Sequence, residues 1–413
     1  MSTSNKVLHG LPEKVFFCKK CVMSNQRPNS VVEFKNTGKT LKPTIFFDEN
    51  QVCSACKYKE IKDNQIDWKK RKSELEVLCD KFRSRNGSYD VVVPGSGGKD
   101  SIMVSHLLKK EFRMNPLTVT WAPHTYTEIG WQNFQNWINS GFDNLLHTPN
   151  GKVHRLLTRL AFKNLCHPFQ PFIIGQRMTG PKFAALFKVP LVVYGEHPAE
   201  YGDRLDEAFQ PKMKEKYFIF DNDIDKLVLG GISAKKIISD YNLSSSDMSP
   251  YMPVDPKTLK EVGVEVHHIS YYVNWDPQEN YYYAVEKGGF KSNSERTQGT
   301  YSKYSSIDDK LDPLHYYTTL VKFGIGRATY DAAQEIRNEK INRDEGVALV
   351  KKYDQEFPDK FYKEMLKYMN ISDDEFWTII DNNRSSHLWE KKNGKWKLKH
   401  QVKTDEQETL FQN

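Results

Sequence analysis

One short segment of this 413-residue chain limits its fold more than any other. Residues 91–93 are three valines, which favour a buried strand, and Pro94 and three glycines interrupted only by Ser96 end the run. Lys99, Asp100 and an apolar stretch at helical spacing follow. A strand, a tight glycine loop and a helix start form a cradle for anions, because glycine lets the backbone approach a phosphate and the helix start offers unpaired N–H groups.

The spacing within this loop excludes two common nucleotide motifs. The P-loop needs Gly-x4-Gly-Lys-Ser/Thr, whereas Asp100 here separates Lys99 from Ser101. The three glycines also do not fit the Gly-x-Gly-x-x-Gly dinucleotide fingerprint. The run Ser96-Gly97-Gly98-Lys99-Asp100-Ser101 instead resembles the PP-loop of ATP pyrophosphatases. The alternative, a glycine-rich turn that merely precedes a helix, leaves six specified positions unexplained.

The PP-loop resemblance implies ATP and Mg²⁺ as ligands. Enzymes with this loop cleave ATP between the α and β phosphates and adenylate a carbonyl or amide oxygen. Lys99 is expected to be the point charge for phosphate, Asp100 a magnesium ligand, and the neighbouring serines hydroxyl donors. The expected nucleotide-binding set is Pro94, Ser96, Gly97, Gly98, Lys99, Asp100, Ser101, Thr120 and Trp121.

Four of the six cysteines are paired by their spacing. Cys18 with Cys21, and Cys53 with Cys56, form two Cys-x2-Cys knuckles. Two knuckles complete a closed tetrahedral zinc site, which leaves no open position for catalysis. The gap between them is longer than usual, so an inserted ribbon such as residues 44–48 is expected there. A disulfide does not suit a reducing compartment, and a two-cysteine redox pair leaves the second knuckle unexplained.

The other two cysteines have no partner by spacing. Cys79 falls in a helical apolar pattern and is expected to be buried. Cys166 precedes His167 in a stretch with two prolines and two aromatic residues, 163–172. Cys166 and His167 are either a nucleophile with its base or two residues of a packed loop. Adjacent side chains on an extended chain point apart, so the two side chains need not touch.

Charge and hydropathy exclude several classes of protein. The net charge of +7 is modest for this length, so it fits a small anionic substrate and argues against a large nucleic-acid footprint. No apolar run approaches the ~18 residues of a membrane span. Met1–Lys6 have no apolar signal region behind them. A cytoplasmic protein without a membrane partner is therefore expected.

Alternation of strands and helices between residues 88 and 200 predicts an α/β fold with a doubly wound, mostly parallel sheet. The expected helices are 68–82, 131–140, 154–162 and 182–187, and the expected strands are 89–93, 117–121, 144–146, 191–194 and 264–273. Ligands of such sheets bind at the carboxyl ends of the strands. The loops to watch are therefore 94–101, 122–130, 148–151 and 195–202.

Four units are expected along the chain. They are a zinc-ribbon module (1–65), a PP-loop ATP pyrophosphatase domain of the adenine nucleotide alpha hydrolase type (66–275), a C-terminal helical, substrate-binding region (276–390), and a polar, frayed tail (391–413).

Three further features are candidate parts of a site. Glu196 and Glu200 follow the strand at 191–194 and either hold magnesium, orient ammonia or point into solvent. Residues 294–304 contain many hydrogen-bond donors and aromatic residues. They either bind a sugar or a nucleotide, or form an ordinary surface. The run Gly-Ile-Gly-Arg opens a helix with Thr329 as its expected cap, and Arg327 there suits a diphosphate group.

Taken together, these parts resemble the bacterial N-acetyl sugar amidotransferases. The resemblance rests on the zinc knuckles with residues 21–28, the PP-loop, residues 129–133 and the Gly-Ile-Gly-Arg helix, and it covers about residues 15–385. It implies conversion of a sugar N-acetyl group to an acetamidino group in the synthesis of lipopolysaccharide O-antigen or pseudaminic-type nonulosonic acids. The implied catalytic residues are Lys99, Asp100, Glu196 and Arg327.

The family takes ammonia from separate glutaminase and cyclase-like subunits, and the acceptor is an N-acetylated nucleotide sugar or a nonulosonic acid. Residue 2 is serine rather than a nucleophilic cysteine, and neither Cys79 nor Cys166 has a Gly-x-Cys-x-Gly context. No glutaminase activity is therefore expected in this chain.

Two other functions remain open. A tRNA-thiolating PP-loop enzyme would use catalytic cysteines or an iron–sulfur cluster near its active site, and only Cys79 and Cys166 are available for that. A non-catalytic nucleotide-binding protein would have little need of an intact Lys99, Asp100 and Ser101.

Overall fold

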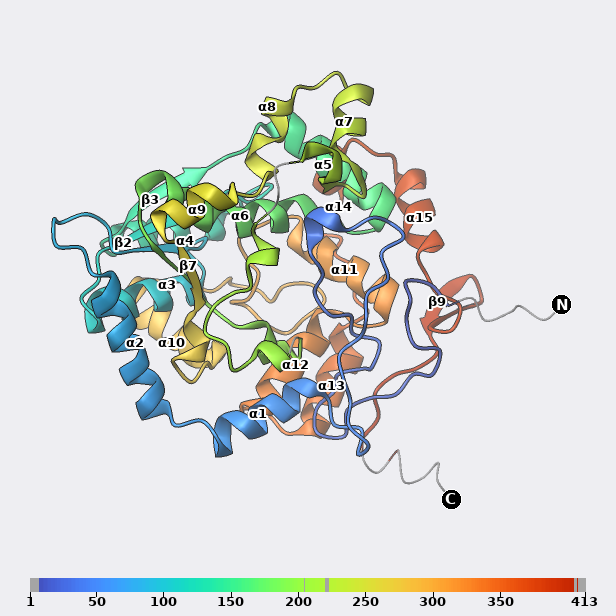
Figure 1. The fold of residues 1–413 in the computed structure, drawn as a ribbon. Coiled ribbons are helices and arrows are strands. Elements are labelled where there is room, and N and C mark those ends of the chain that lie inside the picture. Colours follow the sequence, from blue (N-terminus) through green and yellow to red (C-terminus); the bar gives the residue numbers. More distant parts are fainter. Residues whose placement is uncertain (1–6, 204, 220–222, 405–406, 408–413) are drawn as a thin grey trace.

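The largest sheet of the computed structural model, which describes residues 7–203, 205–219, 223–404 and 407, has five parallel strands (Figure 1). The strand order is β3-β2-β1-β4-β7. The bounds are β1 Val91–Pro94, β2 Pro116–Trp121, β3 Asp143–His147, β4 Leu191–Tyr194 and β7 Glu265–His268. The doubly wound parallel sheet predicted from the sequence is therefore confirmed. The expectations for Met1–Lys6 and for the last residues of the tail lie outside the described residues.

Both faces of the sheet are buried, which is why its strands are rich in valine rather than alternating in polarity. Val91 and Val93 pack on one face against residues of α2 (Trp68–Phe82) and α3 (Lys99–His106). Val92 points to the other face, where α5 (Gly151–Leu165) and α6 (Gln170–Phe187) cover the sheet. The remaining helices near the sheet are α4 (Glu128–Asn139), α9 (Pro256–Val262) and α10 (Pro277–Gly288).

Two expected elements differ from the structure by more than three residues at one end. Helix α6 begins at Gln170, well before the expected residue 182, with Pro171 in its first turn and Pro181 inside it. The expected strand 264–273 ends at His268 and continues as a 3-10 turn, Ile269–Tyr271. The helix at 68–82 and the strand at 191–194 have the bounds that the sequence predicts.

The C-terminal part is helical, as expected. It contains α11 (Asp312–Phe323), α12 (Arg327–Arg337), α13 (Arg343–Tyr353), α14 (Tyr362–Met369) and α15 (Asp373–Asn382). The prediction that Thr329 caps α12 is wrong, because Gly326 is the N-cap residue and the Thr329 hydroxyl donates to Asp354. The expectation of a frayed stretch from residue 391 is wrong for its first part, since β8 (Trp389–Lys392) and β9 (Lys395–Leu398) form a hairpin and Val402 is buried.

The cysteine-rich N-terminal segment packs on this C-terminal part. It has isolated bridges, Pro28 with Thr44 and Phe47 with Cys53, followed by α1 (Ser54–Asn64). Its four knuckle cysteines share one core with residues of α12 and α13, which lie beside α1 in Figure 1. The proposed boundaries of the four units stay a prediction.

The shorter elements lie mostly between β4 and β7. They are β5 (Val228–Leu229), β6 (Ile232–Ser233), α7 (Ala234–Asp240) and α8 (Ser245–Met248), with a π-helical turn at Leu107–Glu111 after α3. Across the described residues, no helix combines the length and apolar character that crossing a bilayer requires.

Candidate functional site

The candidate site lies where the winding of the sheet reverses. Strands β1 and β4 are neighbours, and the chain leaves them toward opposite sides, so a crevice opens at their carboxyl ends. The PP-loop follows β1 and residues 195–202 follow β4. A cavity of about 380 Å³ lies there, and its lining residues include Ser96, Gly97, Gly98, Lys99, Asp100, Glu196 and Arg327. All four residues expected to be catalytic therefore border one cavity.

Close packing explains two glycines of the loop. A Cβ on Gly95 would lie 2.2 Å from the Cβ of Ser101, so any side chain there would displace the start of α3. Gly97 has φ +83°, and a Cβ on it would lie 2.6 Å from the Cα of Phe134 in α4. Glycine at both positions lets the loop fold tightly between the two helices.

Lys99 and Asp100 are the first two residues of α3, next to the helix N-terminus. Lys99 is 8% exposed, and its ammonium forms an ion pair with the Asp100 carboxylate. The amide of Asn280, on α10, donates to the other oxygen of Asp100 at 3.1 Å. The Asp100 carboxylate is thus oriented from two sides before any ligand binds.

Glu196 lies across the crevice from this pair. The hydroxyl of Tyr201 donates to Glu196 Oε1 at 3.1 Å. Burial, and then the Asp100 carboxylate, raise the pKa of Glu196, while Lys99 opposes them. Glu196 is therefore held ready to accept a proton or a cation.

Arg327 reaches the cavity from the C-terminal part of the chain. It is the first residue of α12, its guanidinium contacts Asp331 at 3.1 Å, and it lies 4.3 Å from the centre of the Tyr316 ring. The Asp354 carboxylate accepts from the backbone N–H groups of Gly326 and Thr329, which fixes the start of this helix. An arginine held in this way can bind phosphate oxygens in a bidentate manner.

Sequence reasoning missed four acidic or histidine side chains of the cavity, Asp308, Asp309, Asp312 and His315. Burial raises the pKa of Asp312 to about 7, with Asp308 and Asp309 adding to the rise and Arg327 opposing it. Burial also raises the pKa of Asp308, which a hydrogen bond from Ser96 of the PP-loop opposes. The local sequence offered only a cluster of aspartates before a helix, so these residues could not be assigned without the fold.

Four residues of the expected nucleotide-binding set do not line this cavity. Pro94 ends β1, and the Ser101 hydroxyl donates to the Gly98 carbonyl at 2.9 Å. The Thr120 hydroxyl accepts from Asn144 inside the sheet, and the Trp121 ring packs against Gly175 of α6. Their role in binding a nucleotide stays a prediction.

Glu200 has an environment that differs from all three expectations made for it. It is 9% exposed, and both its oxygens accept from the Lys62 ammonium, at 3.1 and 3.0 Å. Lys62, on α1, also donates to the Trp275 carbonyl at 2.9 Å. Glu200 is therefore neither a free carboxylate in solvent nor a residue of the cavity wall, because both its oxygens are bound in a buried ion pair with Lys62.

Replacing Lys62 by methionine is expected to lower the free energy of unfolding by about 3–5 kcal/mol, since Glu200 would stay buried without its partner. Urea unfolding measures the change. Lys59→Met on the same helix is the matched control, because its partner Asp63 is 41% exposed and stays solvated without the lysine, so the loss there should stay within about 0.5 kcal/mol. Adding Glu200→Gln to Lys62→Met should restore most of the stability, and equal losses for Lys62→Met and Lys59→Met would contradict the buried-pair account.

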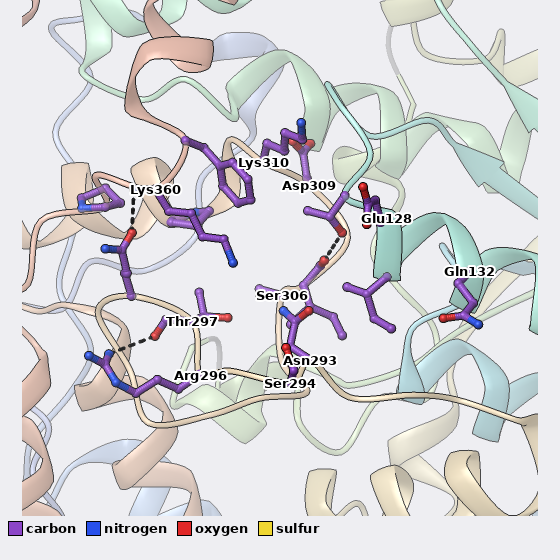
Figure 2. Close-up of a pocket in the computed structure, with 17 residues that line it drawn as sticks. Glu128, Gln132, Asn293, Ser294, Arg296, Thr297, Ser306, Asp309, Lys310 and Lys360 are labelled. Atoms are coloured by element: carbon purple, nitrogen blue, oxygen red, sulfur yellow. Dashed lines mark hydrogen bonds between the residues drawn. The ribbon is translucent and has the colours of Figure 1, made fainter.

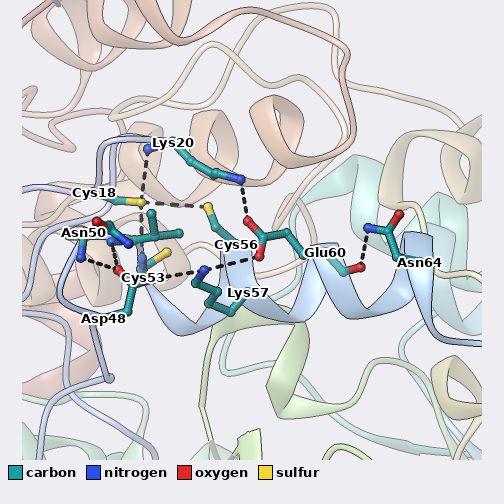
Figure 3. Close-up of polar contacts among 10 residues, drawn as sticks. Cys18, Lys20, Asp48, Asn50, Cys53, Cys56, Lys57, Glu60 and Asn64 are labelled. Carbon is teal, nitrogen blue, oxygen red and sulfur yellow. Dashed lines mark hydrogen bonds and ion pairs between the residues drawn. The ribbon is translucent and has the colours of Figure 1, made fainter.

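The four knuckle cysteines come together as expected, and Figure 3 shows three of them, Cys18, Cys53 and Cys56. Their sulfur atoms all lie within 4.8 Å of one another and are buried. The Cys18 and Cys56 sulfurs are 3.9 Å apart, and those of Cys21 and Cys53 are 3.7 Å apart. Backbone N–H groups of Lys20 and Cys53 point at the Cys18 sulfur, which suits a thiolate. This cluster can hold a metal ion.

The cysteine cluster is linked to the loop after β4. Cys53 is the N-cap residue of α1, and the next residue, Ser54, donates from its hydroxyl to the Gly202 carbonyl at 2.6 Å. A Cβ on Gly202 would lie 2.7 Å from the backbone nitrogen of Ala55. The Arg27 guanidinium donates to the Tyr201 carbonyl. The four-cysteine segment thereby supports the loop that carries Glu196.

Neither remaining cysteine borders the described cavity. Cys79 is 1% exposed in α2, and Cys166 is fully buried at the end of α5. Burial raises the pKa of Cys79 to about 12 and that of Cys166 to about 11, so both are neutral thiols at pH 7. His167 stacks on His315 with ring centres 5.0 Å apart. These observations favour the packed reading of Cys166–His167.

The C-terminal part of the chain is similar to one described protein family. Residues 298–403 match the family described as LPS biosynthesis protein WbpG-like, C-terminal domain. This matched segment contains Asp308, Asp312, His315 and Arg327, which line the cavity. The part of the chain that resembles this family therefore supplies part of the cavity wall.

Two other similarities are less informative. An uncharacterized protein of Methanocaldococcus jannaschii is 33% identical over 88 residues, which make up 20% of this chain and 29% of that protein. The U34-tRNA thiolase NcsA from Methanococcus maripaludis, solved with its 4Fe-4S cluster, is 12% identical, with a TM-score of 0.27 over 84% of this chain and 86% of that one. A superposition this loose does not bear on function.

Proposed function

We propose that this chain is an ATP-dependent amidotransferase that converts the N-acetyl group of a sugar into an acetamidino group and forms AMP and pyrophosphate. The product would enter a surface polysaccharide, as lipopolysaccharide O-antigen or a nonulosonic acid. The observation that carries the proposal is the meeting of Lys99, Asp100, Glu196 and Arg327 in one cavity at the switch point of the sheet. The WbpG-like match of residues 298–403, which supply part of the same cavity, supports the polysaccharide context. Consumption of ATP implies a cytoplasmic location.

In the first step, the acetamide oxygen bonds to the α-phosphorus of ATP, and the bond from that phosphorus to the bridging β oxygen breaks. Pyrophosphate leaves, and the sugar carries an O-adenylyl imidate that keeps the acetamide proton on its nitrogen, so the imidate group is a cation. Negative charge grows on the phosphates, where the PP-loop N–H groups, Lys99 and Arg327 can stabilise it. Asp100 would hold Mg²⁺, which prefers oxygen ligands and supplies further neutralisation of the phosphates.

In the second step, the nitrogen of ammonia bonds to the imidate carbon, the bond from that carbon to the AMP oxygen breaks, and AMP leaves. A proton from the attacking nitrogen passes to the Glu196 carboxylate, whose raised pKa makes it a suitable base. Ammonia would come from separate glutaminase and cyclase-like subunits.

We infer that the metal of the four-cysteine cluster is structural zinc. Four sulfurs at ~2.3 Å from a tetrahedral zinc stand about 3.8 Å apart, close to the 3.9 and 3.7 Å measured between paired sulfurs. In an iron–sulfur cube each thiolate binds a different iron, which would spread the sulfurs farther. All four ligands are cysteines and none borders the cavity, so the ion would support folding rather than catalysis.

The geometry gives little support to the two alternative functions. A thiolase that attacks with cysteine would need one at the cavity, and no described cysteine borders it. A protein that only binds nucleotide has no need of Glu196 held by Tyr201 opposite Lys99 and Asp100.

Mass spectrometry of a reaction with this protein, Mg-ATP, ammonium and a panel of N-acetylated sugars tests the proposal. The panel holds UDP-linked diacetamido sugars and diacetylated nonulosonic acids. We expect a product about one mass unit lighter than its acceptor, because NH replaces O, with AMP and pyrophosphate in equal amounts.

Two further arms complete this test. Glutamine in place of ammonium should give no product with this chain alone, since the chain lacks a glutaminase nucleophile. AMP formed only when tRNA and a sulfur donor are present would move the assignment to thiolation. ATP bound without release of pyrophosphate would move it to a binding protein.

A further inference from the structure

A second cavity, of about 600 Å³, adjoins the candidate active site (Figure 2). Its lining comes from the start of α4, from residues 293–298, from residues 306–310 and from residues 358–361. Its volume falls in the range of sites for small molecules. The sequence stretch 294–304, which was compatible with either a sugar grip or an ordinary surface, supplies one wall of it.

The two cavities share the residues Ser306, Ile307 and Asp309. This dividing segment is held like a strand against residues 125–127. The Thr127 backbone N–H donates to the Asp308 carbonyl at 3.1 Å, and the Lys310 N–H donates to the Thr125 carbonyl at 3.0 Å. A Cβ on Gly130 would lie 2.4 Å from the Asp308 Cα, so only glycine lets α4 approach the segment this closely. One segment of chain therefore separates the second cavity from the PP-loop cavity.

The far wall of the second cavity is held in place by polar contacts. The Arg296 guanidinium donates to both oxygens of Glu356, at 2.6 and 2.7 Å, and lies 4.6 Å from the centre of the Tyr353 ring. The Gly299 N–H donates to the same carboxylate at 2.9 Å. The Gln298 side chain accepts from the Lys360 N–H at 3.0 Å. A wall fixed in this way is preorganised for a ligand, which lowers the entropic cost of binding.

Two ammonium groups of the cavity lining, Lys310 on the dividing segment and Lys360 on the far wall, have only weak partners. Lys310 contacts Glu364 at 2.7 Å, but the Glu364 side chain is 55% exposed. Lys360 lies 4.0 Å from Glu295, and both side chains are largely exposed. Exposed pairs of this kind contribute about 0–1 kcal/mol, so an anionic ligand can replace the carboxylates. Arg296, in contrast, is committed to Glu356.

The rest of the lining suits a hydroxylated ring. Gln132, Asn293 and Thr297 offer amide and hydroxyl groups, and Glu128 offers a carboxylate that can accept from hydroxyls. Figure 2 shows Glu128 and Gln132 on the side opposite Thr297 and Lys360. Ile129 and Phe361 add apolar surface for the C–H face of a sugar or an acetyl methyl group.

We propose that this second cavity binds the acceptor, an N-acetylated sugar with an anionic group that contacts Lys310 and Lys360. The inference rests on the proposed function, because adenylation requires the acetamide oxygen to reach an α-phosphate in the adjoining cavity. The anion and the acetamido group lie at opposite ends of the acceptor, with the acetamido group reaching over Ser306. The anion is a diphosphate in a nucleotide sugar and a carboxylate in a nonulosonic acid.

Steady-state kinetics of Lys310→Ala and Lys360→Ala test this site. Each change should raise the KM for the acceptor about tenfold or more, because a charge-assisted hydrogen bond is lost, while the KM for ATP stays unchanged. Lys363→Ala, at an exposed position outside the lining, is the matched control and should change neither constant. Gln132→Trp should block the acceptor sterically without affecting ATP binding, since Gln132 is exposed on α4.

Saturation-transfer NMR without ATP separates this site from the proposed reaction. The probes are a UDP-linked diacetamido sugar and a diacetylated nonulosonic acid, so the arm that binds identifies the anion. Binding that is lost in Lys310→Ala/Lys360→Ala, with no amidine formed by the wild type, would support the acceptor site and refute the amidotransferase reaction.

The other outcomes of these measurements are equally decisive. Amidine formation with an unchanged acceptor KM in both lysine variants would overturn the site and leave the reaction standing. A raised KM for ATP in those variants would make the cavity part of the nucleotide site. Binding of neither probe to the wild type would overturn the site as well.

Discussion

Alanine in place of Lys99 or Asp100 is expected to lower turnover by about a hundredfold or more, since loss of one preorganised charge-stabilising group typically costs ~3–4 kcal/mol of barrier. Lys99 is buried at the start of α3, and Asp100 is oriented by both Lys99 and Asn280, so both charged groups are preorganised before a ligand binds. Release of pyrophosphate and of AMP, measured under saturating ATP and acceptor, reports the loss.

Lys110→Ala is the matched control for this prediction, because Lys110 is exposed just beyond the same helix. It should retain full turnover. Thermal unfolding of all three variants must stay close to that of the wild type for the comparison to hold. Rates like the wild type in both Lys99→Ala and Asp100→Ala would refute the PP-loop assignment.

The sequence predicts the sheet and the PP-loop well because both depend on local pattern. The valines of β1, the glycines after them and the apolar spacing of α3 all lie within a few turns of chain, and the structure places them as strand, loop and helix. The two knuckles likewise determine which four cysteines meet. Sequence spacing is sufficient to predict the loop and the knuckles, because each is formed by residues that are neighbours in the sequence.

Helix α6 shows where local pattern misleads. Gly175, Gly180 and Pro181 usually interrupt helices, so the sequence predicts a helix only from 182. In the structure the glycines are packing positions, since a Cβ on Gly175 would lie 2.2 Å from the Trp121 ring and one on Gly180 would lie 2.7 Å from the Pro94 ring. Close contact between α6 and the sheet thus requires glycine at positions where the sequence alone suggests that a helix is interrupted.

Contacts between distant segments explain what else the sequence missed. Asp308 and Asp312 join the PP-loop cavity only because the C-terminal part folds back over the sheet. Glu200 meets its partner Lys62 across 138 positions of chain. Nothing near Glu200 in the sequence distinguishes a buried ion pair from a carboxylate in solvent or at a magnesium ion.

Replacing Cys18 by serine is expected to remove the metal and with it most of the stability of the chain, because apparent binding energies of structural zinc reach about 10–16 kcal/mol in small domains. The cluster lies in a core shared with α12 and α13 rather than in a separate module. Its loss should therefore lower the yield of folded protein as a whole. Metal content by mass spectrometry and thermal unfolding measure the two effects.

Cys79→Ala is the matched control, since Cys79 is buried but distant from the cluster, and it should keep the metal. A soluble, metal-free and fully active Cys18→Ser protein would contradict the structural role. A partial effect is also informative, because Ser54, Lys62 and Arg27 connect the cysteine segment to the loop that carries Glu196 and Glu200. Slow removal of the metal by a chelator should therefore weaken turnover before the sheet itself unfolds, as the loop after β4 loses its support first.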